Sequence, residues 1–161
     1  MSAAVEVGVQ NAMPPAGALR IVNPVLRALL RTPIGRLIRG LAVVEFAGAR
    51  TGRRHRVVVG WHVVDGHSFV ITPATWRANF RGGRPATVVR GGRRADYIAT
   101  LDVDPHTVAD IINALLRNGA SARSLALRMP VGHVLSADDV VRIDRAVIRF
   151  EPVNSERVQR P

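Results

Sequence analysis

Apolar, β-branched runs separated by glycine-containing turns mark most of the chain between residues 41 and 103. Such runs predict strands, and a two-residue turn such as Asp65-Gly66 or Gly91-Gly92 predicts a hairpin between the runs that flank it. The predicted strands cover residues 41–46, 56–64, 68–72, 86–90 and 95–103, and a final strand is predicted over 146–150.

Two short basic amphipathic helices are predicted ahead of the first strand, within residues 18–40. Asn23-Pro24 and Thr32-Pro33 each combine an N-cap residue with proline at the first helical position. Apolar residues at helical spacing alternate with arginines after each of these starts. The expected organisation is a flexible tail over 1–17, a single domain over 18–152 and a second tail over 153–161.

Helix signals return after the fifth strand. Asp104-Pro105 is a typical helix start, and apolar residues three and four apart follow it until Gly119. Another short helix is expected over 121–128, and the segment 136–139 resembles a capping box. The order of elements favours an α+β, mainly β fold: a split antiparallel β-barrel of about six strands with N-terminal and C-terminal helices packed on it. Side chains expected in its core include Val57, Val59, Val108, Ile111, Leu115 and Phe150.

The charge of the chain narrows the range of partners. The formal net charge is +11, a surplus that favours an anionic partner such as a phosphate-bearing cofactor, a nucleic acid or an acidic lipid. Only 4% of the residues are aromatic, and no helix-turn-helix, zinc-finger or stacking motif is visible. Specific nucleic-acid recognition is therefore not expected, although a basic nucleic-acid-binding domain stays open as an alternative.

The chain contains no cysteine, which excludes disulfides, thiolate metal ligands and thiol catalysis. No apolar stretch approaches the roughly 20 residues that a membrane-spanning helix needs. The cytoplasm is therefore the expected location. Peripheral membrane contact through residues 23–40 stays open, as an alternative to helices that only cover one face of the barrel.

Motifs of self-sufficient enzymes are missing from the sequence. It has no G-x-G-x-x-G segment after a strand, no G-x-S-x-G and no H-E-x-x-H. His62 and His67 flank a hairpin turn, where solvated side chains are expected in preference to a metal site. We predict no catalytic side chain and no metal, so a bound cofactor would have to supply the chemistry of any enzyme.

Two segments carry candidate binding chemistry. The turn from Gly48 to Arg53 offers backbone N–H groups, a hydroxyl and guanidinium groups, which suit a phosphate but also occur in a solvated basic turn. In the segment 76–80, one helical turn would place Trp76 and Asn79 on the same side, beside a planar ring system. The alternative is a core tryptophan with Asn79 capping a turn.

Together with the hairpin at Asp65-Gly66, Pro85 and the closing segment that ends in Glu151-Pro152, these segments resemble the deazaflavin-dependent nitroreductase family. The resemblance runs in order from about residue 41 to residue 152. It implies a split β-barrel that binds coenzyme F420, or less readily FMN, and transfers a hydride from the reduced cofactor to a small planar electrophile such as a quinone or nitro compound. A non-catalytic binder or carrier of F420, flavin, a haem-type ligand or lipid is the alternative, and a homodimer stays open.

The resemblance also implies roles for individual residues. The phosphate would contact Arg50, Thr51 and Gly52, and the acidic tail would lie near Arg53, Arg54 and Arg56. The segment along the cofactor would be Thr72, Pro73, Ala74 and Thr75, with Trp76 and Asn79 beside it, and the substrate would lie near Trp61 and Trp76. Ala49 departs from the family's basic residue at that position, and residues 120–132 lack the tyrosines of relatives that reduce nitroimidazoles.

Overall fold

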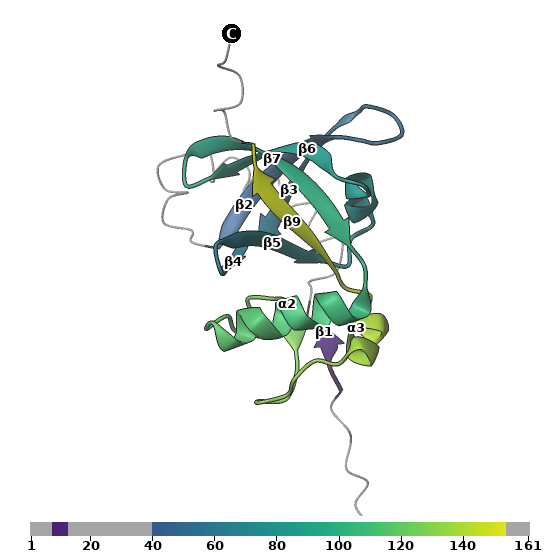
Figure 1. Cartoon of the computed structure of the whole chain (residues 1–161), viewed down its shortest axis with the longest axis vertical. Helices are drawn as coiled ribbons and strands as arrows, with labels where there is room; N and C mark the ends of the chain where they lie inside the picture. The colour runs from purple at the N-terminus through teal and green to yellow at the C-terminus, as the bar shows by residue number, and fades with distance from the viewer. Residues whose placement is uncertain (1–7, 13–39, 154–161) are drawn as a thin grey trace, which may run out of the picture.

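The computed structural model describes residues 8–12 and 40–153, and a seven-stranded antiparallel sheet is its main element (Figure 1). Its strands are β2 (Leu41–Ala47), β3 (Arg54–Gly60), β4 (His62–Val64), β5 (His67–Thr72), β6 (Arg84–Arg90), β7 (Arg93–Asp102) and β9 (Ala146–Pro152). The remaining elements are β1 (Gln10–Asn11), the 3₁₀ helix η2 (Thr75–Phe80), α2 (Pro105–Arg117), β8 (Leu127–Arg128) and α3 (Ala137–Ile143).

The sheet closes on itself at Trp61. Its strand order is β3-β2-β6-β7-β9-β5-β4, so β3 and β4 are the two edge strands. Only Trp61 separates the end of β3 from the start of β4. Consecutive Cα atoms are about 3.8 Å apart, so the two edges must approach each other here. The predicted strand over 56–64 is thus two strands, which is why the sheet has seven strands and not six.

The two faces of the sheet form separate cores. In neighbouring strands, Val70 and Ile148 point into the barrel, whereas Phe69 and Val147 point out toward the helices. The barrel interior contains Ala42, Val44, Phe46, Val59, Trp61, Val70, Phe80, Ala86, Val88, Ala99, Ile148 and Phe150. Figure 1 shows α2 and α3 together at one end of the barrel, where they contact each other and cover part of the sheet.

Four of the six predicted core residues and two of the predicted helix starts are confirmed. Val59, Val108, Leu115 and Phe150 are buried, and the Asp104 carboxylate accepts the Thr107 N–H at 2.9 Å to cap α2. The capping box ahead of α3 is also present. The prediction that Val57 and Ile111 are buried is wrong. Both side chains are only partly buried, because each packs at the margin of a core.

The helix predicted over 121–128 is wrong. Residues 122–126 form turns, and Ala126 has a φ of 52°, a left-handed conformation that ends any helix there. The next two residues form β8, which pairs with β1. Tertiary pairing with the N-terminal segment has therefore overridden the local helical pattern.

The flexible tail predicted over 1–17 is corrected at residues 9–11, because residues 10 and 11 form strand β1 and Val9 is buried. The Asn11 side chain donates to the Ile143 carbonyl at 2.8 Å and accepts from Arg145 Nε at 2.6 Å. The helices predicted within 18–40 and the membrane contact through 23–40 lie outside the described residues, apart from Gly40. In the described ranges, no helix is long and apolar enough to cross a bilayer.

Candidate functional site

A cleft of about 750 Å³ lies over one side of the barrel, where β2, β3, β6 and β7 run next to one another. Such a volume is within the range of small-molecule sites, which is about 300–1,000 Å³. Its lining is Glu45, Phe46, Ala47, Gly52, Arg54, His55, Arg56, Pro85, Ala86, Thr87, Arg94, Asp96, Tyr97 and Val153. Arginines and aromatic rings together make it suitable for a ligand that is both flat and anionic.

A row of polar side chains crosses the floor of the cleft. Arg56, Glu45, Thr87 and Asp96 are direct cross-strand neighbours on four adjacent strands. The two Glu45 carboxylate oxygens pair with Arg56 Nε at 2.8 Å and Arg94 Nη2 at 2.7 Å. The Thr87 hydroxyl donates to Asp96 at 2.7 Å. Glu45 therefore offsets part of the positive charge of the cleft and fixes the direction of two guanidinium groups.

The turn between β2 and β3 closes in the tight form that the sequence predicts. The Gly48 N–H donates to the Arg53 carbonyl at 2.8 Å, and the Gly52 N–H donates back to the Gly48 carbonyl at 2.9 Å. Gly52 has a φ of 66°, where a glycine avoids the strain of a side chain. Within the described part of the chain, no hydrogen bond uses the N–H of Arg50 or Thr51. Both donors are thus available to an anion.

Asn79 joins this turn to η2. Its Oδ1 accepts the Ala49 N–H at 2.8 Å, and its Nδ2 donates to the Trp76 carbonyl at 2.8 Å. Both ends of the amide thus hold backbone groups of the protein. The structure brings the two motif segments together, with Asn79 in the turn-holding position that was the alternative in the sequence.

Aromatic rings pack where the turn meets η2. The Phe46 ring lies 5.3 Å from the ring of His55, 5.9 Å from Trp76 and 4.8 Å from Phe80, measured between centroids. Trp76 is half-buried, so part of its indole stays exposed beside the turn. These contacts fix the positions of Trp76 and His55 without using the exposed sides of their rings.

The predicted site residues divide into those at the cleft and those away from it. Gly52, Arg54 and Arg56 line the cleft, and the exposed side chains of Arg50, Thr51 and Arg53 lie in the adjoining turn. The residues that do not line it are Thr72, Pro73, Ala74, Thr75, Trp76 and Asn79. Thr72 is buried, and its hydroxyl accepts the Ala74 N–H at 3.0 Å, which shapes the entry to η2.

Trp61 is inside the barrel. Its side chain is 4% exposed and packs 4.9 Å from the Phe150 ring and 5.6 Å from the Tyr97 ring, between centroids. The buried indole Nε1 has no hydrogen-bond partner in the described part of the molecule. Trp61 does not line the cleft, whereas Tyr97 lines it and contacts Trp61 from the other side.

Sequence reasoning missed several lining residues, namely Glu45, His55, Arg94 and Asp96. Glu45 lies between the buried Val44 and Phe46, so its strand shows that it points to the opposite face, whereas Arg94 and Asp96 lie in an exposed stretch of β7 that gives no such signal. Their gathering depends on β2 lying between β3 and β6, an order that local patterns do not reveal.

Among the described residues, no group of three or more acidic or histidine side chains is placed to hold a metal ion. His62 is near the barrel seam, where burial lowers its pKa below the usual value. His67 is exposed at the far side of the same hairpin.

No protein-family model matches the sequence, and no curated protein sequence matches it. Solved structures do resemble the chain. HutZ, the haem storage protein from Vibrio cholerae, superposes with a TM-score of 0.50 at 12% identity, over 75% of this chain and 87% of HutZ.

Two further structures have lower scores. A proposed pyridoxamine 5′-phosphate oxidase from Listeria innocua gives a TM-score of 0.45 at 11% identity, over 80% of this chain and 93% of its own. An F420 reductase gives 0.39 at 11% identity, over 79% and 92% of the two chains. The likeness to HutZ, with the closed antiparallel sheet described above, shows that the chain has the split-barrel fold.

Proposed function

We propose that the chain is a deazaflavin-dependent oxidoreductase that binds coenzyme F420 along the arginine-lined cleft and passes a hydride to a small planar electrophile. One observation carries the proposal. The two segments that resemble the deazaflavin-dependent nitroreductase family are hydrogen-bonded to each other through Ala49 and Asn79, 30 residues apart, at the edge of the cleft.

The donors at this edge fit the chemistry of the cofactor. A phosphate needs several N–H donors, and the turn offers the free N–H groups and side chains of Arg50 and Thr51. The acidic tail of F420 needs cations that are not already neutralised. Arg53 and Arg54 have no ion pair within the described ranges, whereas Arg56 is paired with Glu45.

When bound, the reduced deazaflavin supplies the hydride, and the chain's own side chains bind, orient and exclude water. Trp76 supports the substrate side from behind, because its indole packs 5.9 Å from the ring of Phe46, which lines the cleft. Trp61 acts from inside the barrel by supporting Tyr97. No side chain serves as nucleophile or obligatory general base, and solvent or a backbone group supplies the proton. A quinone or nitro compound is the electrophile of choice.

A titration of the purified protein with F420 and, separately, with FMN tests the proposal. We expect saturable quenching of tryptophan fluorescence with F420 and weaker quenching with FMN. Arg50→Ala should weaken F420 binding by about 1.5–3 kcal/mol, the scale of a hydrogen bond to a charged group. Arg90→Ala is the matched control, because this exposed arginine belongs neither to the turn nor to the cleft.

Turnover is tested by mixing the protein with reduced F420 and menadione without oxygen, and following the return of the oxidised deazaflavin absorbance. F420 binding without turnover of any quinone or nitro compound would identify a carrier instead of an enzyme. Unchanged affinity in a folded Arg50→Ala variant would identify the turn as a solvated basic turn and remove the basis for the proposal.

A further inference from the structure

A second concavity lies in the helical layer and shares no lining residue with the cleft. It has a volume of about 440 Å³ and runs between the C-terminal half of α2 and the loop 129–134. We call it the α2 groove. Its lining is Asn113, Leu116, Arg117, Ala122, Met129, Pro130, Val131, Gly132, His133 and Val134.

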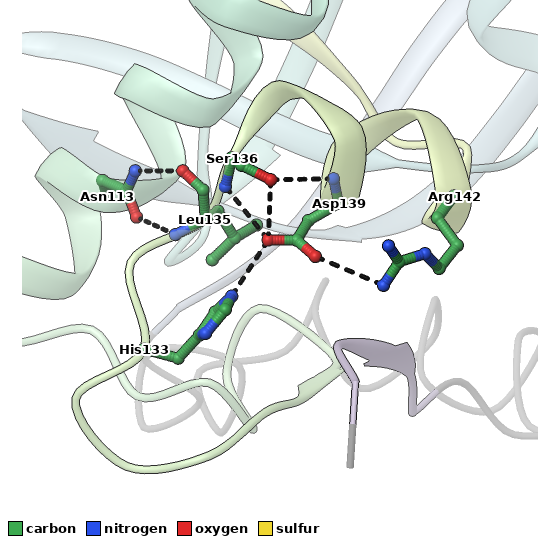
Figure 2. Close-up of polar contacts among 6 residues, drawn as sticks. All are labelled: Asn113, His133, Leu135, Ser136, Asp139 and Arg142. Carbon is green, nitrogen blue, oxygen red and sulfur yellow. Dashed lines mark hydrogen bonds and ion pairs between the residues drawn. The ribbon is translucent and has the colours of Figure 1, made fainter. Parts of the chain in front are cut away.

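The loop that forms one wall of the α2 groove is held in place by side-chain hydrogen bonds (Figure 2). Asn113 on α2 binds both backbone groups of Leu135: its Oδ1 accepts the N–H at 2.9 Å, and its Nδ2 donates to the carbonyl at 2.9 Å. His133 Nε2 lies 2.9 Å from Asp139 Oδ2 on α3. A concavity whose walls are fixed before a ligand arrives avoids much of the entropy cost of binding.

The wall carries apolar side chains that the described part of the protein leaves in water. Val131 is fully exposed, and Val134 is 68% exposed. Leu116 and Met129 are partly buried beside them, so the apolar surface continues into the groove. Contiguous exposed apolar surface of this kind is typical of binding sites.

The polar side chains that a ligand can reach in the α2 groove include no acidic group. Both ends of the Asn113 amide are occupied, which leaves Arg117 and His133 as the polar side chains open to a ligand. Asp139 is ionised, because hydrogen bonds from the Ser136 backbone and from His133 lower its pKa. An ionised carboxylate only accepts, so His133 Nε2 donates to it and Nδ1 stays open.

Charged side chains surround His133. Asp139 is the carboxylate that faces the ring, and Arg142 lies on the far side of Asp139, at 3.5 Å from Oδ1. The guanidinium of Arg117 on α2 adds a permanent positive charge to the same groove.

We propose that the α2 groove binds a small amphipathic carboxylate, whose apolar body lies against Leu116, Met129 and Val134 and whose acid group meets the Arg117 guanidinium. One apolar wall with one permanent cation matches a molecule with a single terminal negative charge. This inference does not depend on the deazaflavin proposal, because the two concavities lie on different elements.

The test compares decanoate with 1-decanol by following backbone amide NMR shifts in the intact protein. We expect saturable shifts in residues 129–134 with decanoate and at least about tenfold weaker binding of decanol, the loss that one charge-assisted hydrogen bond causes. Arg117→Gln should reduce decanoate affinity to that of decanol. Arg123→Gln is the control, because this exposed arginine lies on the neighbouring turn and does not line the groove.

A second pair of variants tests the apolar wall. Val134→Asp should abolish the decanoate shifts, whereas Val141→Asp should leave them unchanged, since Val141 is 65% exposed but lies outside the groove. Shifts confined to the cleft residues 45–56, or equal effects of both valine variants, would overturn the proposal. Binding to phosphatidylglycerol vesicles that Val134→Asp removes, together with no response to decanoate, would assign the surface to a membrane and overturn it as well.

Discussion

The amide oxygen of Asn79 accepts the backbone N–H of Ala49 at 2.8 Å, so a residue of η2 holds the turn between β2 and β3. The same side chain donates to the Trp76 carbonyl at 2.8 Å. The Asn79 amide thus fixes the position of the turn relative to Trp76, the second residue of η2. In the proposed enzyme, Asn79 is a positioning residue: it acts through the turn, while the turn's free donors contact the phosphate.

We expect Asn79→Ala to weaken F420 binding by about tenfold and to lower the free energy of unfolding by about 1 kcal/mol, the net value of one hydrogen bond. Asn79→Asp keeps the acceptor for Ala49 and loses the donor to Trp76, so it should retain most of the affinity. Fluorescence titration and the Ala49 amide NMR shift measure the two effects. An alanine variant that binds F420 as wild type does would exclude the positioning role.

Arg145 links the N-terminal strand to the body of the protein, and only 4% of its surface is exposed. Its Nη2 donates to the Ala126 carbonyl at 2.7 Å, and its Nε donates to Asn11 Oδ1 at 2.6 Å. Burial lowers the pKa of Arg145 to about 10, which still leaves the guanidinium charged at neutral pH. Arg145→Met should cost about 2–4 kcal/mol, because it removes two hydrogen bonds that a charged, buried donor makes to partly exposed acceptors.

Arg145→Lys is the matched control for charge. A lysine ammonium is a point charge without the planar fork of arginine, so it cannot reproduce both hydrogen bonds in the same geometry. We expect its stability in urea unfolding to lie between wild type and the methionine variant. Equal stability of all three proteins would show that the Asn11 and Ala126 contacts contribute nothing measurable.

The parts of the fold that follow from neighbouring residues could be predicted from the sequence. Asp65-Gly66 and Gly91-Gly92 specify hairpins because both residues of each turn adopt positive φ. Asp104 caps α2 through a bond to a residue three positions away. Each of these signals lies within a few residues of the structure it specifies.

Contacts between distant residues could not be predicted in this way. Arg145 resembles any surface arginine, and its partner Asn11 is 134 residues away. The arginines of the β2–β3 turn suggested an anion site, but the pairing of Arg56 with Glu45 depends on strand register. Trp61 marks the barrel seam only because β3 and β4 are opposite edges of one sheet. That order is set by packing of the whole sheet.

Burial of His62 makes the protein's stability depend on pH. Burial lowers its pKa, so the folded state releases the proton more readily than the unfolded state, whose histidines titrate near about 6.5. The unfolded state therefore binds more protons as the pH falls below that value, and the free energy of unfolding decreases with it. At higher pH, the His62 ring is neutral in both the folded and the unfolded state, so it no longer changes the free energy of unfolding.

Urea unfolding between about pH 7.5 and pH 5 measures this loss. We expect His62→Gln to flatten the decrease in stability over this window. His67→Gln, at an exposed position of the same hairpin, should follow the wild-type curve. The explanation fails if the two variants show the same pH profile.

Two variants of Tyr97 distinguish a packing role of this side chain from a role as proton donor in the proposed enzyme. It lines the cleft, and its ring lies 5.6 Å from Trp61 and 6.0 Å from Phe150 between centroids. Tyr97→Phe keeps the ring, so menadione reduction should stay within about tenfold, well short of the 10²–10⁴-fold loss of a general acid. Tyr97→Ala removes the support and should impair substrate use. A collapse of turnover in the phenylalanine variant, with F420 still bound, would instead make Tyr97 the proton donor.

Arg54 and Arg56 both line the cleft, but the structure predicts different contributions to cofactor binding. Arg56 Nε pairs with Glu45 at 2.8 Å, whereas Arg54 has no ion pair within the described ranges. A guanidinium already paired to a carboxylate has less attraction left for another anion. We expect Arg54→Ala to weaken F420 binding by about tenfold and Arg56→Ala by less than about threefold.

A cofactor without its glutamate tail tests the cause of this difference. If Arg54 attracts the acidic tail, then Arg54→Ala and wild type should bind the tail-less F420 with equal affinity. Glu45→Gln supplies the complementary measurement, because it releases both Arg56 and Arg94 from their shared carboxylate. That variant should bind tailed F420 more tightly, and more steeply so at low salt, since the added attraction is screened by ions. Equal losses in Arg54→Ala and Arg56→Ala, with no gain in Glu45→Gln, would show that the Glu45 pairing does not control binding in the cleft.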